Sequence, residues 1–448
     1  MKKYSYLRKL ATFGAVATTA ALVLSGCSSG TSGSSFGASA PQSLKGTVSL
    51  WHFFTDREAS VIKGVVDNFE KANPGVTVTI HSGQDDQKLQ QKIATGGDID
   101  VAISGSTDSV GLFCSSGSFR DLAPVISRDK VDMSQFSDVA RSYTSFDGKQ
   151  CALPMPADAY GLYYNTDLLK AAGYTAPPKT LSELEAMALK MTTYNTDGSI
   201  KTLGFNPLMN FYENQPVNWT GVNGAAWMSD DGTKSDVNNQ AWKDLLTWQK
   251  GFIDKIGYDK LKAFSAGLGD EWSANNAFQT GQLAMNLDGE WRVAFIADQK
   301  PDLHYGTAPF PTGDQYTDLY GGGYTTGTIA GIAKGSQHAE LAWALLKYLA
   351  TNTDAVVDLS NGIKNIPTTK DALSSPKLDF PEQFTTFLDI AKSPHLITVP
   401  ATAIGHANQT TFQNFWDNWQ SGADTDLEAG LAKVDHDIDN ALALSKAP

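Results

Sequence analysis

Hydrophobic and polar residues recur along the chain with two different periods. Four apolar residues have the i, i+3, i+4, i+7 spacing of a helix with one buried face: Ile62, Val65, Val66 and Phe69. Asn73-Pro74-Gly75 would end this helix, and residues 76–80 then alternate as a strand. Because the two periods keep alternating, the sequence predicts an α/β fold with helices on both faces of a parallel sheet.

The same periods predict elements in the rest of the chain. Strands are expected at residues 47–51, 100–103, 160–164 and 283–287. Helices are expected at residues 84–94, 239–254, 271–279, 339–350 and 427–444. Roughly 400 residues of such a pattern exceed what one hydrophobic core usually holds, so we expect two domains.

Three Asp residues alternate near the end of the chain, at positions 435, 437 and 439. A calcium-binding loop of this spacing would also need a Gly at its sixth position and a Glu at its twelfth. Asn440 stands where the Gly would be, inside the predicted last helix. We therefore interpret the three Asp side chains as a solvated face of that helix.

The first residues have the pattern of a secretory signal. Lys2, Lys3, Arg8 and Lys9 are followed by an uncharged run at 10–24, which is too short for a comfortable membrane span. The run ends in Leu24-Ser25-Gly26-Cys27, which resembles the lipobox of bacterial lipoproteins. The resemblance implies a signal peptide at 1–26, a diacylglycerol on Cys27 and a flexible linker at 27–43, rich in Ser and Gly. The alternative is an ordinary signal peptide with an incidental cysteine.

Charge and cysteine content narrow the function classes. The net charge is −13, which argues against nucleic-acid binding because such proteins carry a basic face. Beyond Cys27 only Cys114 and Cys151 remain, and outside the cytoplasm such a pair is expected to form a disulfide. Two separately buried thiols are the alternative. The seven histidines have no metal-ligand spacing, so we expect no metal, no cofactor and no catalytic residue.

Aromatic residues near loop-like segments carry the main chemical signal. Sugars present flat C–H faces that pack on aromatic rings, and hydroxyls that pair with carboxylates and amides. The candidates for such a site are His52, Phe53, Trp219, Trp227, Trp272, Asp288, Glu290, Trp291, Gly323 and Tyr324. Each aromatic residue also has a core interpretation, which for Trp219, Trp227 and Trp272 is as good as the binding one.

Several stretches together resemble the solute-binding proteins of sugar-importing ABC transporters, the group that includes maltose-binding protein. These stretches are 48–54, 69–76, Gly97-Asp98-Ile99-Asp100-Val101, 147–154 with 161–169, and 278–285 with Gly289-Glu290-Trp291. The resemblance implies two α/β lobes joined by a hinge, with the ligand in the cleft between them. One lobe would hold 44–157 and 325–360, and the other 158–324 and 361–448.

The resemblance also implies site residues and partners. Asp158 and Trp291 occupy positions of sugar contacts in that group, Trp219 and Asn408 fall near others, and Lys364 is added as a cationic candidate. The implied function is capture of a carbohydrate, with an oligosaccharide favoured, for ABC import by a lipid-anchored protein on the outer face of the membrane. The implied partners are a permease and no nucleic acid, and a monomer is the simplest state.

Three alternatives remain open. A surface-anchored glycoside hydrolase would use Asp158 with Asp288 or Glu290 as its carboxyl pair. A binding protein for another solute, such as a polyamine or glycerol phosphate, is the second alternative. A phosphate ligand would need cationic residues at the cleft, where the candidates are Arg57, Arg292 and Lys364. A binding protein coupled to a chemoreceptor has the same sequence features as an importer subunit.

Overall fold

The computed structural model describes residues 36–445 of the 448-residue chain. The predicted signal peptide, the lipidation at Cys27 and the linker up to residue 35 lie outside the described residues. In the described part, no helix is both long and apolar enough to cross a membrane.

The first part of the chain alternates strands and helices. Its elements are β1 (Gly46–His52), α1 (Asp56–Ala72), β2 (Val76–His81), α2 (Asp86–Ala94), β3 (Val101–Ser104), α3 (Ser109–Ser115), α4 (Ala123–Asp129), η1 (Met133–Gln135), α5 (Asp138–Ser142), β4 (Ser145–Phe146), β5 (Lys149–Gln150) and β6 (Leu153–Asn165). The predicted helix with the four apolar residues is α1, and all four are buried.

The middle of the chain is richer in helices and turns. Its elements are α6 (Thr166–Ala171), α7 (Leu181–Met191), β7 (Thr193–Tyr194), β8 (Ile200–Thr202), η2 (Pro216–Trp219), α8 (Thr220–Asn223), α9 (Gln240–Ile256), α10 (Tyr258–Ala266), β9 (Met285–Gly289), α11 (Arg292–Gln299), β10 (Tyr305–Ala308), η3 (Thr317–Leu319) and β11 (Gly323–Ile332).

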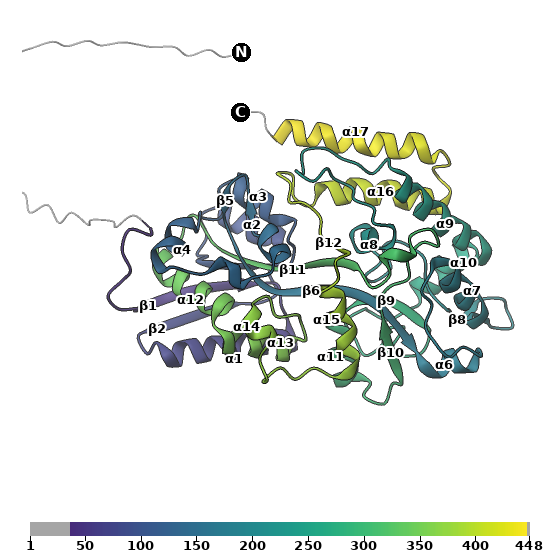
Figure 1. Ribbon diagram of the computed structural model, residues 1–448, viewed down its shortest axis with the longest axis horizontal. Helices are drawn as coiled ribbons and strands as arrows, with labels where there is room; N and C mark the ends of the chain where they lie inside the picture. The colour runs from purple at the N-terminus through teal and green to yellow at the C-terminus, as the bar shows by residue number, and fades with distance from the viewer. Residues whose placement is uncertain (1–35, 446–448) are drawn as a thin grey trace, which may run out of the picture. The chain divides into compact units, whose positions relative to one another are not determined.

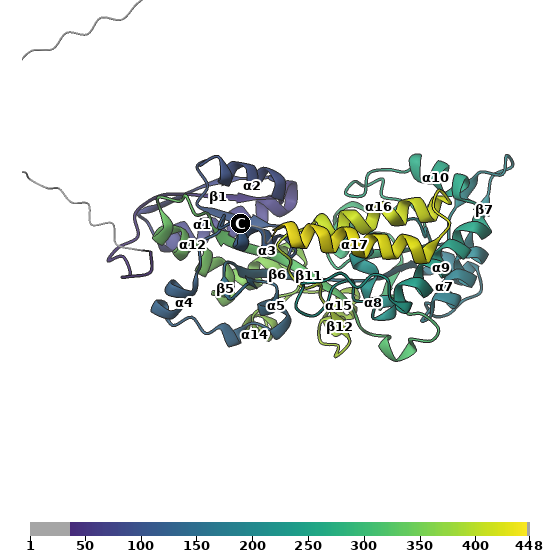
Figure 2. The same ribbon diagram turned by 90° about the horizontal axis from the view of Figure 1, so that it is seen from above.

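The last part is almost wholly helical. Its elements are α12 (Ala339–Thr351), α13 (Thr353–Ile363), α14 (Lys370–Leu373), η4 (Glu382–Phe384), α15 (Thr385–Ala391), β12 (Leu396–Ile397), α16 (Ala407–Ser421) and α17 (Leu427–Ser445). Figures 1 and 2 show α16 and α17 side by side.

One mixed sheet connects the elements, in the strand order β10-β6-β11-β3-β1-β2. The strands β2, β1 and β3 are parallel, as the sequence predicts, whereas β11 runs antiparallel to both β3 and β6. The strand β6 has 13 residues and β11 has 10. Each is therefore long enough to pair with different neighbouring strands along its two halves. Figure 1 shows these two strands crossing the middle of the fold.

Buried side chains form two groups of hydrophobic clusters, which meet along β6 and β11. The first group, here called the N-terminal core, contains residues between 48 and 155 and between 329 and 363. The second, the C-terminal core, contains residues between 159 and 324 and between 366 and 442. The chain therefore passes from one core to the other three times: in β6, in β11 and after α13.

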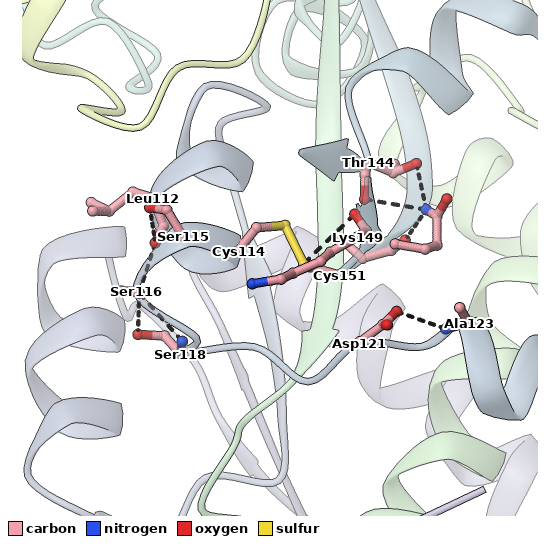
Figure 3. Close-up of a disulfide and its surroundings, with 12 residues drawn as sticks. Leu112, Cys114, Ser115, Ser116, Ser118, Asp121, Ala123, Thr144, Lys149 and Cys151 are labelled. Atoms are coloured by element: carbon pink, nitrogen blue, oxygen red, sulfur yellow. Dashed lines mark hydrogen bonds between the residues drawn. A yellow bond between two sulfur atoms is a disulfide. The ribbon is translucent and has the colours of Figure 1, made fainter. Parts of the chain in front are cut away.

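A disulfide joins Cys114 at the end of α3 to Cys151, just before β6 (Figure 3). This is the pair that the sequence predicts. Both residues are buried in the N-terminal core. The bridge closes a segment of 37 residues that contains α4 and α5.

The helix predicted at 271–279 is wrong, because this segment forms consecutive turns. Side-chain oxygens take the backbone N–H groups that a helix would use: Asp270 Oδ1 accepts from Trp272 N at 3.0 Å, and Asn276 Oδ1 accepts from Phe278 N at 2.9 Å. Asp and Asn compete in this way with helical hydrogen bonds. The segment therefore presents Trp272 from a turn.

The solvated face predicted for α17 is correct for only one of its three Asp residues. Asp435 accepts hydrogen bonds from Val237 N at 2.8 Å and Asn238 N at 3.2 Å. Asp439 accepts one from Ser235 N at 2.7 Å. Only Asp437 pairs along the helix, with Lys433. Two of the acidic residues thus hold the loop before α9 against the last helix.

Candidate ligand-binding site

The candidate site lies where β6 and β11 pass between the two cores. Successive side chains of a strand point to opposite faces, so Asp158 and Tyr160 of β6 share one face, and Ala157 and Ala159 share the other. In the paired register Asp158 lies opposite Thr326 of β11. The position of the site is thus set by the two longest strands of the sheet.

Four aromatic residues form a continuous row from this face outward, here called the aromatic strip. Tyr324 and Tyr160 have ring centroids 5.8 Å apart, and Tyr160 meets the edge of Trp291 at 5.5 Å. Trp272 lies 6.4 Å from Trp291 and is 46% exposed. Trp291 is half-buried, so the strip passes from covered rings to a solvent-facing one. Such rings offer flat apolar faces to a ligand.

The two Trp rings of the strip are held by different neighbours. The indole of Trp291 packs against the backbone of Gly289, whose missing side chain makes room for it. Trp272 lies beside the guanidinium of Arg292, whose Cζ is 5.4 Å from the ring centroid. Arg292 is itself fixed by Asp288, with Nε to Oδ2 at 2.7 Å, and both side chains are fully buried. The ion pair therefore positions the outer ring.

Two buried carboxyl groups lie beside the aromatic strip and share one amide. Asn365 Nδ2 donates to Asp158 Oδ1 and to Glu290 Oε1, the latter at 2.9 Å. Glu290 Oε2 also accepts from Ala159 N at 2.8 Å. Burial raises the pKa of Asp158 to about 7, and burial together with the charge of Asp158 raises the pKa of Glu290 well above its usual range. The pair therefore holds protons at a pH where free carboxyls have lost them.

A second part of the candidate site, beside the inner end of the strip, is formed by the N-terminal core and the segment before α16. A pocket of about 600 Å³ lies there, between Phe53, Asp86, Ser109 and His406. Asp86 Oδ2 accepts from Ser104 Oγ at 2.7 Å and from Ser109 Oγ at 2.6 Å. Serine hydroxyls and the carboxylates of Asp85 and Asp86 thus line a pocket in which Phe53 is the apolar aromatic wall.

The pocket and the aromatic strip are linked through one short polar chain. His406 Nδ1 lies 3.6 Å from Asp108 Oδ2, and the adjacent Thr107 bonds Thr326 through their hydroxyls at 2.8 Å. Burial raises the pKa of Tyr324, two residues before Thr326 on β11, well above its usual range. The tyrosine therefore remains a hydrogen-bond donor, and the site is continuous from His406 to Trp272.

Five of the residues predicted for the site lie along the strip and its carboxyl pair: Asp158, Trp272, Glu290, Trp291 and Tyr324. Gly323 precedes Tyr324 and lies against Gly221, where a Cβ on Gly221 would be 2.6 Å from Gly323 Cα. Phe53 lines the pocket. The sequence thus predicts the outer and inner ends of the site.

Several other predicted residues have structural roles. They were expected to contact a ligand, but their side chains are buried against other residues of the chain. Trp219 packs among Phe205, Phe310 and Trp248, and Trp227 packs against Trp242 and Phe412, so neither ring has an open face. His52 is fully buried, and burial lowers its pKa to about 4, so it is a neutral core residue. Asp288 uses both oxygens on Arg292, Asn286 and Gly289 N.

Two further predicted residues are held by neighbours outside the strip. Lys364 adopts the left-handed conformation that ends α13, with φ 64°, and its Nζ donates to the carbonyl of Asp379. Asn408 is buried at the start of α16, where its Oδ1 accepts from Gln409 N at 2.7 Å. The hydrogen bonds of both side chains thus go to residues outside the aromatic strip.

Sequence reasoning missed Tyr160, Asn365, Asp86 and His406. A signal for Tyr160 was available, because it follows the predicted Asp158 by two positions on a strand and must share its face. Asn365 comes from the third passage between the cores, 207 residues from Asp158, so no local pattern indicates it. Across residues 36–445 we find no group of three or more His, Cys, Asp or Glu side chains arranged to hold a metal.

Comparison with solved structures defines the class of the fold. A mannotriose-bound protein named CpMnBP1 matches with a TM-score of 0.78 at 24% identity, covering 88% of this chain and 99% of that one. The sugar-binding protein MalE of Xanthomonas citri matches with a TM-score of 0.71 at 22% identity, covering 89% and 98%. The fold is therefore that of periplasmic-type binding proteins, as the sequence predicts.

Sequence comparison gives the family. Residues 64–386 match the bacterial extracellular solute-binding proteins, and the chain belongs to this family. A maltotriose-binding protein of Pyrococcus abyssi is 22% identical over 338 residues, or 74% of this chain and 69% of that protein. A maltodextrin-binding protein of Bacillus subtilis is 28% identical over 308 residues, or 66% and 67%.

Proposed function

We propose that the protein captures a carbohydrate, most readily an oligosaccharide, for import by an ABC transporter. The observation that carries this proposal is the aromatic strip of Tyr324, Tyr160, Trp291 and Trp272 beside the Asp158–Glu290 carboxyl pair. The two outer rings, Trp272 and the half-buried Trp291, offer apolar faces on which sugar rings can stack. The polar groups beside them would pair with sugar hydroxyls. The names of the relatives from Pyrococcus and Bacillus support the same ligand class.

Ligand capture would proceed by closure of two lobes, residues 44–157 with 325–360 and residues 158–324 with 361–448. Two contacts between the cores support this motion. Arg57 Nε of α1 lies 3.3 Å from Asp298 Oδ2 of α11, and Asp108 lies beside His406. A sugar that touches both sides would stabilise the closed arrangement through its differential affinity, and a permease would respond to that arrangement.

The proposed location is the outer face of the membrane, with a lipid on Cys27 and the chain as a monomer. The lipobox-like stretch at 24–27 supports the anchor, and family membership supports an extracytoplasmic place. Mass spectrometry of the membrane-extracted protein tests the anchor directly. A mature N-terminus at Cys27 carrying a diacylglycerol is the expected result, and an unmodified N-terminus would rule the anchor out.

Binding is tested by titrating the protein with maltotriose, mannotriose and their monosaccharides while tryptophan fluorescence and thermal melting are recorded. A ligand that binds only the native state raises the melting temperature by mass action. We expect a saturable shift with one oligosaccharide class and no sugar release during long incubation. Release of product would instead favour the hydrolase alternative, in which Asp158 and Glu290 act as its carboxyl pair.

The aromatic strip is tested by Trp272→Ala, because this ring is 46% exposed and its removal leaves the core intact. Tyr194→Ala is the matched control, since this ring is 47% exposed and belongs to β7, outside the strip. We expect the Trp272 variant to lose about tenfold in oligosaccharide affinity, as a contact ring of a binding site does. Equal affinities for the two variants would exclude the strip as the sugar platform.

A further inference from the structure

A second pocket lies on the opposite face of the crossing strands from the aromatic strip. It is lined by Ala157 of β6 and Thr325 of β11, whose neighbours Asp158 and Tyr324 face the strip. Its other walls come from both cores: Tyr143 follows α5, and Leu388 lies in α15. The pocket has a volume of about 110 Å³, well above the roughly 10–15 Å³ that one water molecule needs.

Three buried hydroxyl groups in this pocket have no hydrogen-bond partner among the described residues. They belong to Tyr143, Thr368 and Thr369, whose side chains line the pocket and which are 2%, 6% and 2% exposed. Burial raises the pKa of the Tyr143 phenol well above its usual range, so the group stays protonated and able to donate. Buried hydroxyls are normally paired, so three in one small pocket indicate an occupant that accepts hydrogen bonds.

The charges at the pocket are all of one sign, although the chain as a whole carries −13. Lys370 and Lys392 line the pocket, and no carboxylate does. Neither lysine takes part in an ion pair in the described part of the chain. Thr368, Thr369 and Lys370 are consecutive, so two hydroxyls and one ammonium come from the same stretch of wall.

The remaining wall is aliphatic. Val139, Leu373, Leu388 and Leu396 line it, together with Ile366 and Pro367. An occupant therefore needs a short hydrocarbon part for this wall and a compact anionic, hydrogen-bond-accepting group for the hydroxyls and lysines. A phosphate or sulfate alone would leave the aliphatic wall without a partner.

We infer that this pocket binds a small aliphatic monocarboxylate of about three to five carbons, at a site separate from the sugar site. The carboxylate accepts from Thr368, Thr369 and Lys370, and the chain packs on the leucines. Because both cores contribute walls, such a molecule would contact both cores, on the face of β6 and β11 that is opposite the aromatic strip.

The test is a titration of the full-length protein with ¹³C-labelled butyrate, followed by NMR line broadening, with butan-1-ol as the uncharged comparison. We expect saturable butyrate binding, at least about tenfold tighter than that of butan-1-ol. Thr368→Val should weaken butyrate by about tenfold, and Thr368→Ser, which keeps the hydroxyl, should restore it. Binding should persist in Trp291→Ala, which alters only the sugar site.

Charge is tested by replacing both lysines, Lys370→Gln with Lys392→Gln, which should weaken butyrate about fivefold. Lys201→Gln is the control, since Lys201 is an exposed lysine of β8 away from the pocket. Absence of saturable butyrate binding would overturn the inference. So would equal binding of butyrate and butan-1-ol, or equal effects of the lysine pair and Lys201, because an apolar cavity or non-specific attraction would then account for the data.

Discussion

The indole ring of Trp291 lies directly over the backbone of Gly289, two residues earlier in the chain. A Cβ atom built on Gly289 would be 2.3 Å from Cη2 of Trp291, far closer than carbon atoms approach. The Gly-Glu-Trp stretch at the end of β9 thus has a steric explanation. Gly289 leaves space for the ring. Glu290 belongs to the carboxyl pair with Asp158, and the Trp291 ring belongs to the aromatic strip.

Gly289→Ala should displace the Trp291 ring and weaken sugar binding. Trp291→Ala should cost about 2 kcal/mol of binding free energy, or roughly thirtyfold in Kd, and we expect Gly289→Ala to approach that loss. Titration calorimetry measures both losses, with the oligosaccharide that gives a saturable shift in the fluorescence titration. Gly64→Ala is the control, because a Cβ at Gly64 in α1 meets nothing within 4 Å. Unchanged sugar affinity in Gly289→Ala would show that binding does not depend on the position of the Trp291 ring over Gly289.

The sequence predicts most of the scaffold of this site but not all of its side chains. The helix α1 follows from its helical period, because one face of it is buried. The strands β1, β2 and β3 follow from short β-rich runs between polar and turn residues. Asp158 and Trp291 followed from the resemblance to sugar-importing binding proteins. In contrast, the order of β6, β11 and β3 in the sheet depends on pairings between residues far apart in sequence, such as Asp158 with Thr326.

Trp219 and Trp227 were assigned to the site for the same physical reason. Trp219 and Trp227 fall in stretches without a regular period, which suggested loops, yet the surrounding 3-10 and short helical turns pack them into the C-terminal core. An irregular sequence pattern does not distinguish an exposed loop from one whose side chains are buried in the core. Asn365 is the opposite case, a polar residue without any local signal that becomes central once the third passage between the cores brings it to Asp158.

Removal of the disulfide should destabilise the protein without changing the sugar site. Cys114 and Cys151 are 37 residues apart, and a loop of that length is expected to contribute about 4 kcal/mol through the entropy of the unfolded chain. We expect urea unfolding of Cys114→Ser with Cys151→Ser to show a loss of that order and unchanged sugar affinity at low temperature. A double variant as stable as the parent would indicate that the bridge constrains little.

The Asp158–Glu290 pair predicts a pH dependence of stability with a defined sign. The pKa of Asp158 is about 7 in the folded protein and about 4 in an unfolded chain, so the folded state binds the proton more tightly. The stabilising contribution is complete below about pH 4 and is lost as the pH rises to about 7. The Asp158→Asn variant has no such carboxyl group and should not suffer this loss. Its unfolding free energy relative to that of the parent should therefore rise by up to about 4 kcal/mol between pH 4.5 and pH 7.5.

Urea titrations of both proteins at the two pH values measure this gain. Asp437→Asn serves as the control, because its carboxylate lies on the surface of α17 beside Lys433. Hydrogen bonds lost in Asp158→Asn lower stability similarly at both pH values and cancel in the difference. A difference between the variant and the parent that stays constant with pH would contradict the raised pKa of Asp158 in the folded protein.

The Arg57–Asp298 contact should make a small, salt-sensitive contribution to closure. Arg57 Nε lies 3.3 Å from Asp298 Oδ2, and its guanidinium carbon is 5.4 Å from the ring centroid of Phe295. The Asp298 side chain is 57% exposed, so the ion pair is worth only about 0.5 kcal/mol. Asp298→Ala should lower sugar affinity about twofold at low salt, and the effect should vanish at 1 M salt. Asp67→Ala, whose partner Lys63 is on the same helix, should leave affinity unchanged.

Asp435 should be far more important to stability than its neighbour Asp437, although both belong to the same acidic stretch of α17. Asp435 is the acceptor for two backbone N–H groups, those of Val237 and Asn238. Buried donors that lose their acceptor cost about 1–3 kcal/mol. Asp435→Ala should therefore lower the unfolding free energy by about that amount and speed hydrogen exchange at the Val237 and Asn238 amides. Asp437→Ala should change stability by less than about 0.5 kcal/mol, as exposed substitutions generally do. Similar effects of the two substitutions would mean that the loop before α9 is held by its apolar contacts alone, and that the solvated interpretation of the acidic stretch was right after all.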